Sequence, residues 1–424
     1  MDGKPKQQQS PGTLAWKRFR SNTLGMVSLG FVILWALLAL FAYLIIPDKT
    51  PNANRQILEI STKKPGFEVD MLMIPKETPP QKTPFIDFLL NGRPDDCIYL
   101  PFNSIKVDKE KTIVYLYQAE ESLTVRTETI DNRELVLGGV STGSTTLEST
   151  GSGTLDSDDR FASLRGTKQS KSVDPSTDSR ALAFASVEEA DTYIRSHCVK
   201  HRKFLLGTDQ FGRDFLSRLV LGSRISLTVG FIAVLLSLMI GIMMGSLGGF
   251  FRGKVDDLVV WFINVVWSIP TLLLVIAITF ALGKGIAQVF IAVGLTMWVE
   301  VARIVRGQIL SIRETTFVEA GRALGFKDLR IIFRHILPNI LNPIIVVSAA
   351  NFASAILLEA GLSFLGIGVQ PPMPSWGSMI KENYAFIILD AAYLAILPGI
   401  AIMLLVLAFM LIGNALREAL DVKN

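Results

Sequence analysis

The chain has 424 residues, of which 50% are hydrophobic and 19% charged, and it carries a formal net charge of +4 with a mean hydropathy of +0.40. Such an apolar, weakly charged composition is typical of an integral membrane protein and excludes an ordinary soluble globular protein.

Long apolar runs locate six candidate transmembrane helices, because a helix needs about 20 apolar residues to cross a hydrocarbon core of roughly 30 Å. Four runs contain no Asp, Glu, Lys or Arg, namely 24–46, 225–251, 258–283 and 391–416. The other two must continue past charged residues to be long enough. Residues 285–299 continue through Glu300 and Arg303, and residues 340–358 extend past Glu359.

Basic residues near the ends of these runs gather on one side of a six-helix arrangement. They are Lys17, Arg18 and Arg20, then Arg252 and Lys254, the seven basic residues of 303–334, and finally Arg417 and Lys423. The opposite side has only Lys284 and Lys381 in its short loops. Basic residues in short loops stay cytoplasmic, so both termini are expected in the cytoplasm. The first run is longer than a signal-peptide core and no A-x-A site follows it, so it is expected to remain as an anchor.

Residues 47–206 form a polar insert that this topology places outside the cytoplasm. The insert has more acidic than basic residues, so the basic excess belongs to the membrane part. That distribution favours contact with anionic lipid or protein over nucleic acid.

Within the insert, the patterns predict a domain of mixed α/β structure. Residues 112–118 and 123–130 are β-branched and aromatic, as in strands. The Gly/Ser/Thr tract 138–159 is too polar to pack a core, so a mobile loop is expected there. Ser186 and Glu189 have capping-box spacing, which predicts a helix over 187–197.

Both cysteines, Cys97 and Cys198, lie in the insert, as suits an oxidising compartment. A bridge between them would close a loop of about 100 residues and contribute on the order of 4 to 5 kcal/mol. The alternative is two unrelated small apolar side chains. His197, Cys198 and His201 also have a spacing seen in metal sites. That spacing is common by chance, and no metal site is assigned.

Enzyme motifs are missing from the sequence. It contains no G-x-x-x-x-G-K-[ST], no H-E-x-x-H and no G-x-S-x-G, and none of its three histidines falls in a predicted span. Catalysis within the membrane and nucleotide hydrolysis by this chain are therefore not expected.

The loop between the fourth and fifth predicted spans, 303–339, is polar, basic and punctuated by glycines and a proline. Residues 316–324 have helix-forming composition, Gly325 ends this helix, and a second helix over 326–337 is limited by Pro338. An interfacial helix that binds lipid headgroups would fit the charge. Small residues at Ala320, Gly321 and Ala323 favour docking against another protein, because they allow close backbone approach.

The sequence EAGRALG at 319–325, followed by ILP at 336–338, resembles the EAA loop of ABC-importer permeases. In that family a short helix of the loop inserts into a cleft of the ATPase subunit. The resemblance implies that the coupling residues are Glu319, Ala320, Gly321, Ala323, Leu324, Gly325, Ile336, Leu337 and Pro338. Two positions depart from the pattern, since Gly321 replaces an alanine and His335 an isoleucine. Glycine loosens a helix by about 1 kcal/mol relative to alanine.

Three further stretches, 207–227, 255–270 and 356–377, are similar to the dipeptide, oligopeptide and nickel permeases, specifically the second permease of the pair. The resemblance covers 12–46 and 207–424, and the insert is its large departure. It implies an all-α polytopic fold with six transmembrane helices, as in type I ABC importers. The implied organisation is a cytoplasmic segment 1–23, a first helix 24–46, the insert 47–206 and a permease core 207–424.

The resemblance also implies partners and a location. They are a sister permease, two ABC ATPase subunits that hold ATP and Mg, an extracytoplasmic solute-binding protein and membrane lipid, in a bacterial cytoplasmic membrane. This chain itself is expected to bind no cofactor and no nucleic acid. The solute is expected to be a peptide or a related small solute, with nickel left open as another possibility. A homodimeric pore stays open beside a heterodimeric one.

Polar residues inside predicted spans are candidates for a pathway. Glu359 is expected to face the bundle interior, to pair with a neighbour or to lie at the outer interface, because an ionised carboxylate facing lipid costs several kcal/mol. A role for Glu359 or Asn264 in lining a pathway is the alternative. Before the second span, Asp209, Arg213 and Asp214 are expected to fix one another in the turn 207–214, and direct contact with substrate is the alternative.

A different class of protein fits part of the sequence: a membrane-tethered sensor whose insert carries the function. The loop at 303–339 discriminates between the two, since a sensor has no reason to place a docking helix between spans.

Overall fold

The computed structural model describes residues 11–76, 83–118, 126–137, 184, 186–283 and 285–420. Internal contacts divide the chain into two units. The membrane unit comprises Met1–Asn54, Leu89–Gly92 and Phe215–Asn424, and the insert unit comprises Arg55–Phe88 and Arg93–Asp214. Residues 47–54 and 89–92 therefore pack with the membrane helices, and residues 207–214 pack with the insert. The insert unit thus differs from the range 47–206 that the sequence predicts for the insert. The Gly/Ser/Thr tract at 138–159 lies outside the described residues.

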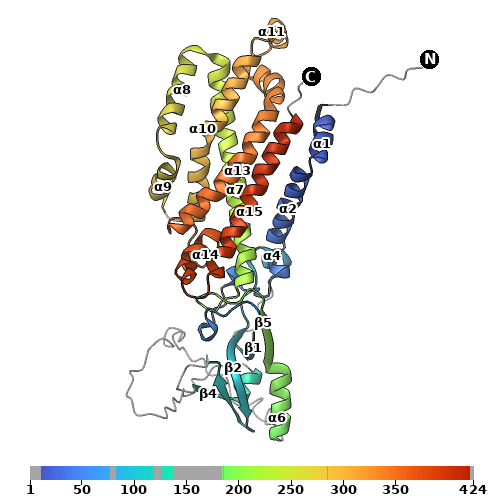
Figure 1. Cartoon of the computed structure of the whole chain (residues 1–424), viewed down its shortest axis with the longest axis vertical. Coiled ribbons are helices and arrows are strands. Elements are labelled where there is room, and N and C mark those ends of the chain that lie inside the picture. Colours follow the sequence, from blue (N-terminus) through green and yellow to red (C-terminus); the bar gives the residue numbers. More distant parts are fainter. Residues whose placement is uncertain are drawn as a thin grey trace, which may run out of the picture. The chain divides into compact units, whose positions relative to one another are not determined.

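The membrane unit is entirely helical in its described part (Figure 1). Its long helices are α2 (Thr23–Leu40), α7 (Phe215–Phe251), α10 (Ile286–Ile312), α13 (Leu341–Phe364) and α15 (Tyr393–Leu420). Its shorter helices are α1 (Pro11–Ser21), α3 (Ala42–Ile45), α8 (Gly253–Trp267), α9 (Thr271–Leu282), α11 (Thr316–Ala323), α12 (Asp328–Ile331) and α14 (Trp376–Asn383). Five helical segments are long and apolar enough to span a membrane, and a sixth is formed if α8 and α9 count as one span.

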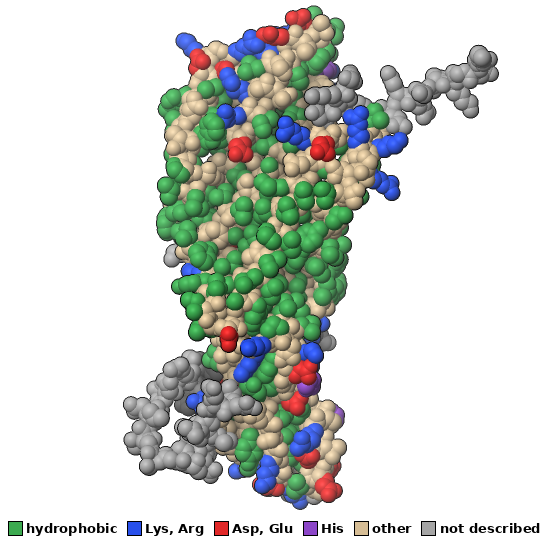
Figure 2. All heavy atoms as spheres, viewed as in Figure 1, with side chains coloured by type: hydrophobic (Ala, Val, Ile, Leu, Met, Phe, Trp, Pro, Cys, Tyr) green, Lys and Arg blue, Asp and Glu red, His purple; other side chains and the backbone are tan. Residues whose placement is uncertain are grey.

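The surface of this unit agrees with a membrane protein. Hydrophobic side chains cover its middle, and charged side chains gather at the end that carries α11 (Figure 2). The predicted class, a polytopic α-helical membrane protein, is confirmed.

The third predicted span, 258–283, is divided into two helices. Helices α8 and α9 meet at an angle of 91° across Ser268–Pro270. Proline has no backbone donor and disfavours helical geometry in the residue before it, so α8 does not continue through Pro270, which instead caps the start of α9. The span is therefore broken at the proline.

Helices α7 and α10 pack through a row of glycines spaced four residues apart. A Cβ atom added at Gly241, Gly245 or Gly249 would lie 2.5 Å from Val301 Cβ, 2.6 Å from the Ala302 carbonyl oxygen and 2.9 Å from the Arg306 carbonyl oxygen, respectively. Small residues at this spacing let membrane helices approach closely, where packing replaces the hydrophobic effect. We call this contact the glycine seam.

Arg224 of α7 joins two chain segments that are distant in sequence. Its guanidinium donates to the carbonyl oxygens of Ala39 and Leu40, at the end of α2, at 3.0 and 3.2 Å. It also donates to the carbonyl oxygens of Leu89 and Leu90 at 3.0 and 2.7 Å. The last carbonyls of a helix lack partners within the helix, so one arginine satisfies groups at the ends of two helices.

The insert unit is built on a five-stranded antiparallel sheet with the order β4-β3-β2-β1-β5. The strands are β1 (Phe67–Pro75), β2 (Cys97–Val107), β3 (Lys111–Leu116), β4 (Thr127–Asp131) and β5 (Val199–Phe204), and the helices are α5 (Asn132–Leu137) and α6 (Val187–Tyr193). Helix α4 (Phe85–Asn91) begins in the insert unit and ends in the membrane unit. The predicted strands at 112–118 and 123–130 correspond to β3 and β4, and residues 119–125 lie outside the described part. Ser186 caps α6 by accepting from the Glu189 amide at 3.2 Å. The mixed α/β character of the insert is confirmed.

The disulfide interpretation is not supported by the structure. Cys97 and Cys198 are free thiols, and burial raises the pKa of each. Cys97 begins β2, Cys198 precedes β5, and β1 lies between those two strands. Two strand spacings amount to roughly 10 Å, whereas the Cα atoms of a disulfide lie at most about 7 Å apart.

The histidines beside Cys198 make separate contacts. His197 stacks on Tyr193 with the ring centroids 4.4 Å apart, and His201 Nδ1 lies 2.8 Å from Asp70 Oδ1. In the part of the chain that the structure describes, no three His, Cys, Asp or Glu residues converge as metal ligands.

The glycine seam leads to a stability prediction. We expect Gly245→Ala to lower the stability of the purified protein by about 1 to 3 kcal/mol, the usual effect of overpacking, because the new methyl group meets backbone atoms of α10. The measurement is thermal unfolding in detergent. Gly307→Ala is the matched control, since a Cβ atom there has nothing within 4 Å. Equal melting temperatures for the two variants would contradict the seam.

Candidate functional site

Helix α11 ends in a defined turn. The Phe326 amide donates to the Gly321 carbonyl at 3.0 Å and the Gly325 amide donates to the Arg322 carbonyl at 2.9 Å. This pair of bonds is the Schellman motif, which requires a left-handed residue just after the helix. Gly325 supplies that residue with φ of +74°. The end predicted for this helix is therefore confirmed in its geometry.

One side of α11 is buried and the other is exposed. Val318 and Gly321 are buried, whereas Glu319, Ala320, Ala323 and Leu324 are exposed. A Cβ atom added at Gly321 would lie 3.6 Å from the Phe326 ring, an ordinary contact, so this glycine is not required by space.

The buried side of α11 belongs to a core cluster that reaches into three long helices. The cluster consists of Phe250 from α7, Val301, Val305 and Ile309 from α10, Val318 from α11, Ile331, Ile332, Ile336 and Ile340 from the segment after it, and Ile344 and Val347 from α13. Each fully buried side chain of this size stabilises the fold by about 1.5 to 3 kcal/mol relative to exposure. The cluster therefore joins α11 firmly to the helices that cross the membrane.

Polar contacts brace the same end of the unit. Arg313 donates to the Phe250 carbonyl at 2.6 Å, and Arg252 pairs with Glu314 at 2.5 Å. Arg306 of α10 makes two hydrogen bonds to Asp256 of α8, at 2.5 and 2.7 Å. Bidentate pairs of this kind fix geometry as well as adding energy, so the ends of α7, α8 and α10 are held to one another.

The second predicted helix, 326–337, is only partly correct. Helix α12 covers Asp328–Ile331, and helical turns of wider and tighter pitch carry the chain through Pro338 directly into α13. Pro338 falls in the first turn of a helical segment, where no backbone donor is needed, so it does not end the helix there. Of the predicted coupling residues in this part, Ile336 is buried, Leu337 is half-buried and Pro338 is exposed.

His335, which departs from the family pattern, is used locally. Its ring stacks on Phe326 with centroids 5.6 Å apart, and the Arg330 guanidinium lies 4.3 Å from the centre of the same Phe326 ring. Phe326 thus contacts two neighbouring side chains just beyond the turn at Gly325.

Glu359 of α13 is fully buried and surrounded by hydroxyl groups. Its carboxyl oxygens accept from Ser363 at 2.7 Å and from Ser226 of α7 at 3.3 Å, and Ser375 also hydrogen-bonds the carboxyl group. In the described part of the chain it forms no ion pair. The expectation that it faces the interior and is paired agrees with these contacts, and a role in a pathway stays a prediction.

Asn264 lies apart from this cluster, on the exposed side of α8. The structure therefore does not bring together the two residues proposed for a pathway.

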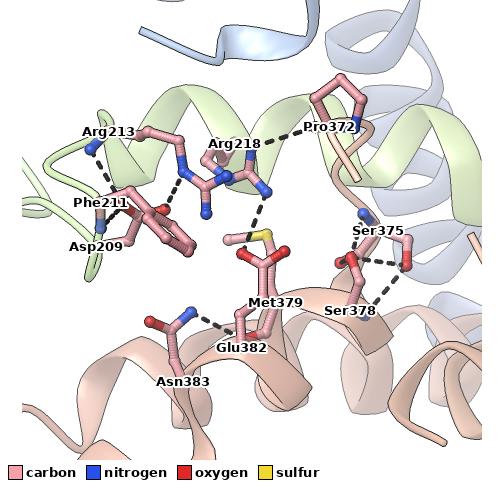
Figure 3. Close-up of polar contacts among 10 residues, drawn as sticks. All are labelled: Asp209, Phe211, Arg213, Arg218, Pro372, Ser375, Ser378, Met379, Glu382 and Asn383. Carbon is pink, nitrogen blue, oxygen red and sulfur yellow. Dashed lines mark hydrogen bonds and ion pairs between the residues drawn. The ribbon is translucent and has the colours of Figure 1, made fainter. Parts of the chain in front are cut away.

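At the end of the membrane unit away from α11, α14 is locked against α7. The Trp376 side chain is fully buried, and its indole donates to the Leu219 carbonyl at 2.9 Å. A Cβ atom added at Gly222 would lie 2.8 Å from that indole. Figure 3 shows Arg218 of α7 directed toward Glu382 of α14, with a nitrogen–oxygen distance of 3.5 Å.

Sequence reasoning missed Arg218, Ser226, Ser363 and Trp376. Their partners lie far away in the sequence, except for Ser363, whose spacing of four residues from Glu359 was the one available signal.

In the insert unit, the turn 207–214 is fixed as expected. Asp209 accepts from the amides of Phe211 and Arg213 and pairs with the Arg213 guanidinium at 2.6 Å (Figure 3). Both charged side chains are buried, so their role here is to hold the turn.

Replacing two glycines at the end of α11 should change the stability of this helix in opposite directions. Gly325→Ala should loosen α11, because a left-handed alanine costs about 1 to 3 kcal/mol. Gly321→Ala should tighten α11 by about 1 kcal/mol through helix propensity. Hydrogen–deuterium exchange of residues 316–331 is the measurement, with faster exchange expected in the first variant and slower exchange in the second. The same change in both variants would contradict the assignment.

Comparisons with known proteins match these features. Residues 237–423 match the family described as binding-protein-dependent transport system inner membrane component, and residues 10–61 match the N-terminal transmembrane domain of oligopeptide transport permease C. The glutathione transport system permease protein GsiD of Pectobacterium atrosepticum is 42% identical over 51% of this chain and 72% of its own length. The dipeptide permease DppC of Alkalihalophilus pseudofirmus is 44% identical over 51% and 71%, and the di/tripeptide permease DppC of Pseudomonas aeruginosa is 41% identical over 52% and 73%. The chain therefore belongs to the family of binding-protein-dependent transport system inner membrane components, the non-enzymatic permease subunits of ABC importers.

Proposed function

We propose that this permease carries small peptides, or a related small solute, inward across the cytoplasmic membrane of a bacterium, with both of its termini in the cytoplasm. The substrate class is supported by the names of the relatives, which are permeases for glutathione, dipeptides and tripeptides. The orientation is supported by the basic residues near α11 and both chain ends. The observation that carries the mechanism is α11, a short helix with one side locked to the membrane helices and the other bare.

The bare side of this region fits a protein partner. Four large apolar side chains are exposed there, with exposed fractions of 42% for Phe317, 72% for Leu324 and 62% for Leu329 and Phe333. Exposed apolar groups next to charged ones are typical of protein docking surfaces. In the proposed assembly an ABC ATPase subunit receives this surface, with Glu319 at its edge.

The core cluster joins α11 to the membrane helices, so in the proposed mechanism they move together. When ATP closes a pair of ATPase subunits, the docked helix moves with them, and a rigid connection to α7, α10 and α13 passes the displacement to the spans. ATP and Mg belong to the ATPase subunits, so this chain contributes motion and no chemistry. A sister permease, forming a heterodimeric pore, and an extracytoplasmic solute-binding protein complete the proposed assembly.

Charge reversal on the exposed side of α11 tests this function. Glu319→Lys should abolish co-purification with the ATPase subunit and abolish peptide uptake, while membrane insertion stays normal, because Glu319 makes no contact in the core. Uptake of a labelled dipeptide and affinity purification of the assembly are the measurements.

Glu188→Lys is the matched control, because it makes the same charge change in the first turn of α6 in the insert unit. The control should leave both readings unchanged. Survival of partner binding and uptake in Glu319→Lys would overturn the docking role of α11.

A further inference from the structure

A groove separates the α11-side halves of α7 and α8 on the surface of the membrane unit. It has a volume of about 600 Å³ and is lined by Met244 and Leu247 of α7 and by Lys254, Val255, Leu258, Val259, Trp261 and Phe262 of α8. Seven of these eight residues are apolar, and Lys254 is the one charged residue among them.

The groove exists because α8 folds back on α7 without filling the space between them. Arg252, with φ of +56°, makes the turn. Val259 and Ile263 then pack with Ile240 and Met244 on the inner side. The outer side stays open, since Leu258 is 65% exposed and Trp261 is 61% exposed.

Lys254 lies at the chain-turn end of the groove, one residue into α8. From Lys254 to Phe262 the helix rises about 12 Å, so the groove begins at a cation and continues along apolar side chains into the depth of the membrane. The arrangement matches the layout of a phospholipid, with a charged headgroup followed by an acyl chain.

The neighbouring charges leave Lys254 available. Arg252 pairs with Glu314, and Asp256 pairs with Arg306. Asp257 follows Lys254 by three residues on the same helix and does not line the groove. In the described part of the chain, Lys254 makes no hydrogen bond or ion pair, and its place in the first turn of a helix is unfavourable for a cation. Its position is therefore not explained by the stability of α8.

We propose that this groove binds one anionic phospholipid, with its phosphate at Lys254 and an acyl chain along Leu258, Trp261 and Phe262. Charge complementarity identifies an anionic headgroup, and basic pockets between membrane helices on the cytoplasmic side are known to hold such lipids. On the orientation proposed above, the groove opens to the leaflet that carries the negative surface potential.

Native mass spectrometry of the purified full-length protein tests the headgroup. Phosphatidylglycerol and phosphatidylcholine are the probes. Lys254→Gln should weaken phosphatidylglycerol binding about fivefold, the factor that corresponds to ~1 kcal/mol for one basic residue near the surface. Binding of phosphatidylcholine should not change. Lys327→Gln, which removes an exposed lysine outside the groove, should leave both lipids unaffected, and Lys254→Arg should restore binding.

A photocrosslinking benzophenone side chain at Leu258 tests the occupant in cells. A phospholipid adduct supports the proposal. An adduct with another protein chain would overturn it, and so would equal phosphatidylglycerol affinity in Lys254→Gln and the unaltered protein. Neither measurement depends on solute uptake, so the result stands apart from the transport function.

Discussion

The close approach of α7 to α10 is the constraint on which the rest of the membrane unit depends. Lipid tails are as apolar as leucine side chains, so helices in a membrane associate through packing and not through exclusion of water. Three glycines at spacings of four residues let the two backbones meet. From that contact, α10 extends to the core beneath α11, and α7 extends to Trp376 and Glu359. Both functional ends are therefore carried by one helix pair.

Much of this architecture could be predicted because the membrane imposes simple rules. Apolar length located the helices, and the left-handed turn at Gly325 followed from glycine alone. Pro270 indicates a kink in the third span, but a break of 91° could not be derived from it, because many membrane helices keep a proline within a continuous helix, as α15 does with Pro398. The disulfide between Cys97 and Cys198 is not supported, and the reason is the order of the strands. Sequence spacing does not reveal that β1, whose pairs with β2 and β5 are both long-range, lies between them.

The coupling residues were predicted from a resemblance to a family. The structure adds which residues of α11 are buried against the membrane helices and which are exposed. Helix α11 has only eight residues, so its pattern lies within a short stretch of sequence. In it, Val318 and Gly321 are buried, whereas Glu319 and Ala320 between them are exposed. The contact between Glu359 and Ser226 cannot be derived in this way, because the two residues are 133 positions apart. Local chemistry is thus visible in sequence, whereas a buried polar group must be satisfied by whatever the fold brings to it.

The hydrogen bonds from Arg224 to Leu89 and Leu90 mean that the residues between the first and second spans do not form one separable piece. Residues 89–92 belong to the membrane unit although they are encoded in the middle of the extra segment, so the chain passes between the two units four times. The segment between the first two spans therefore joins the membrane unit at residues 89–92 as well as at its two ends. Removing everything between the first and second spans would therefore also remove a piece of the membrane unit, and it would take away two of the four carbonyl groups to which Arg224 donates.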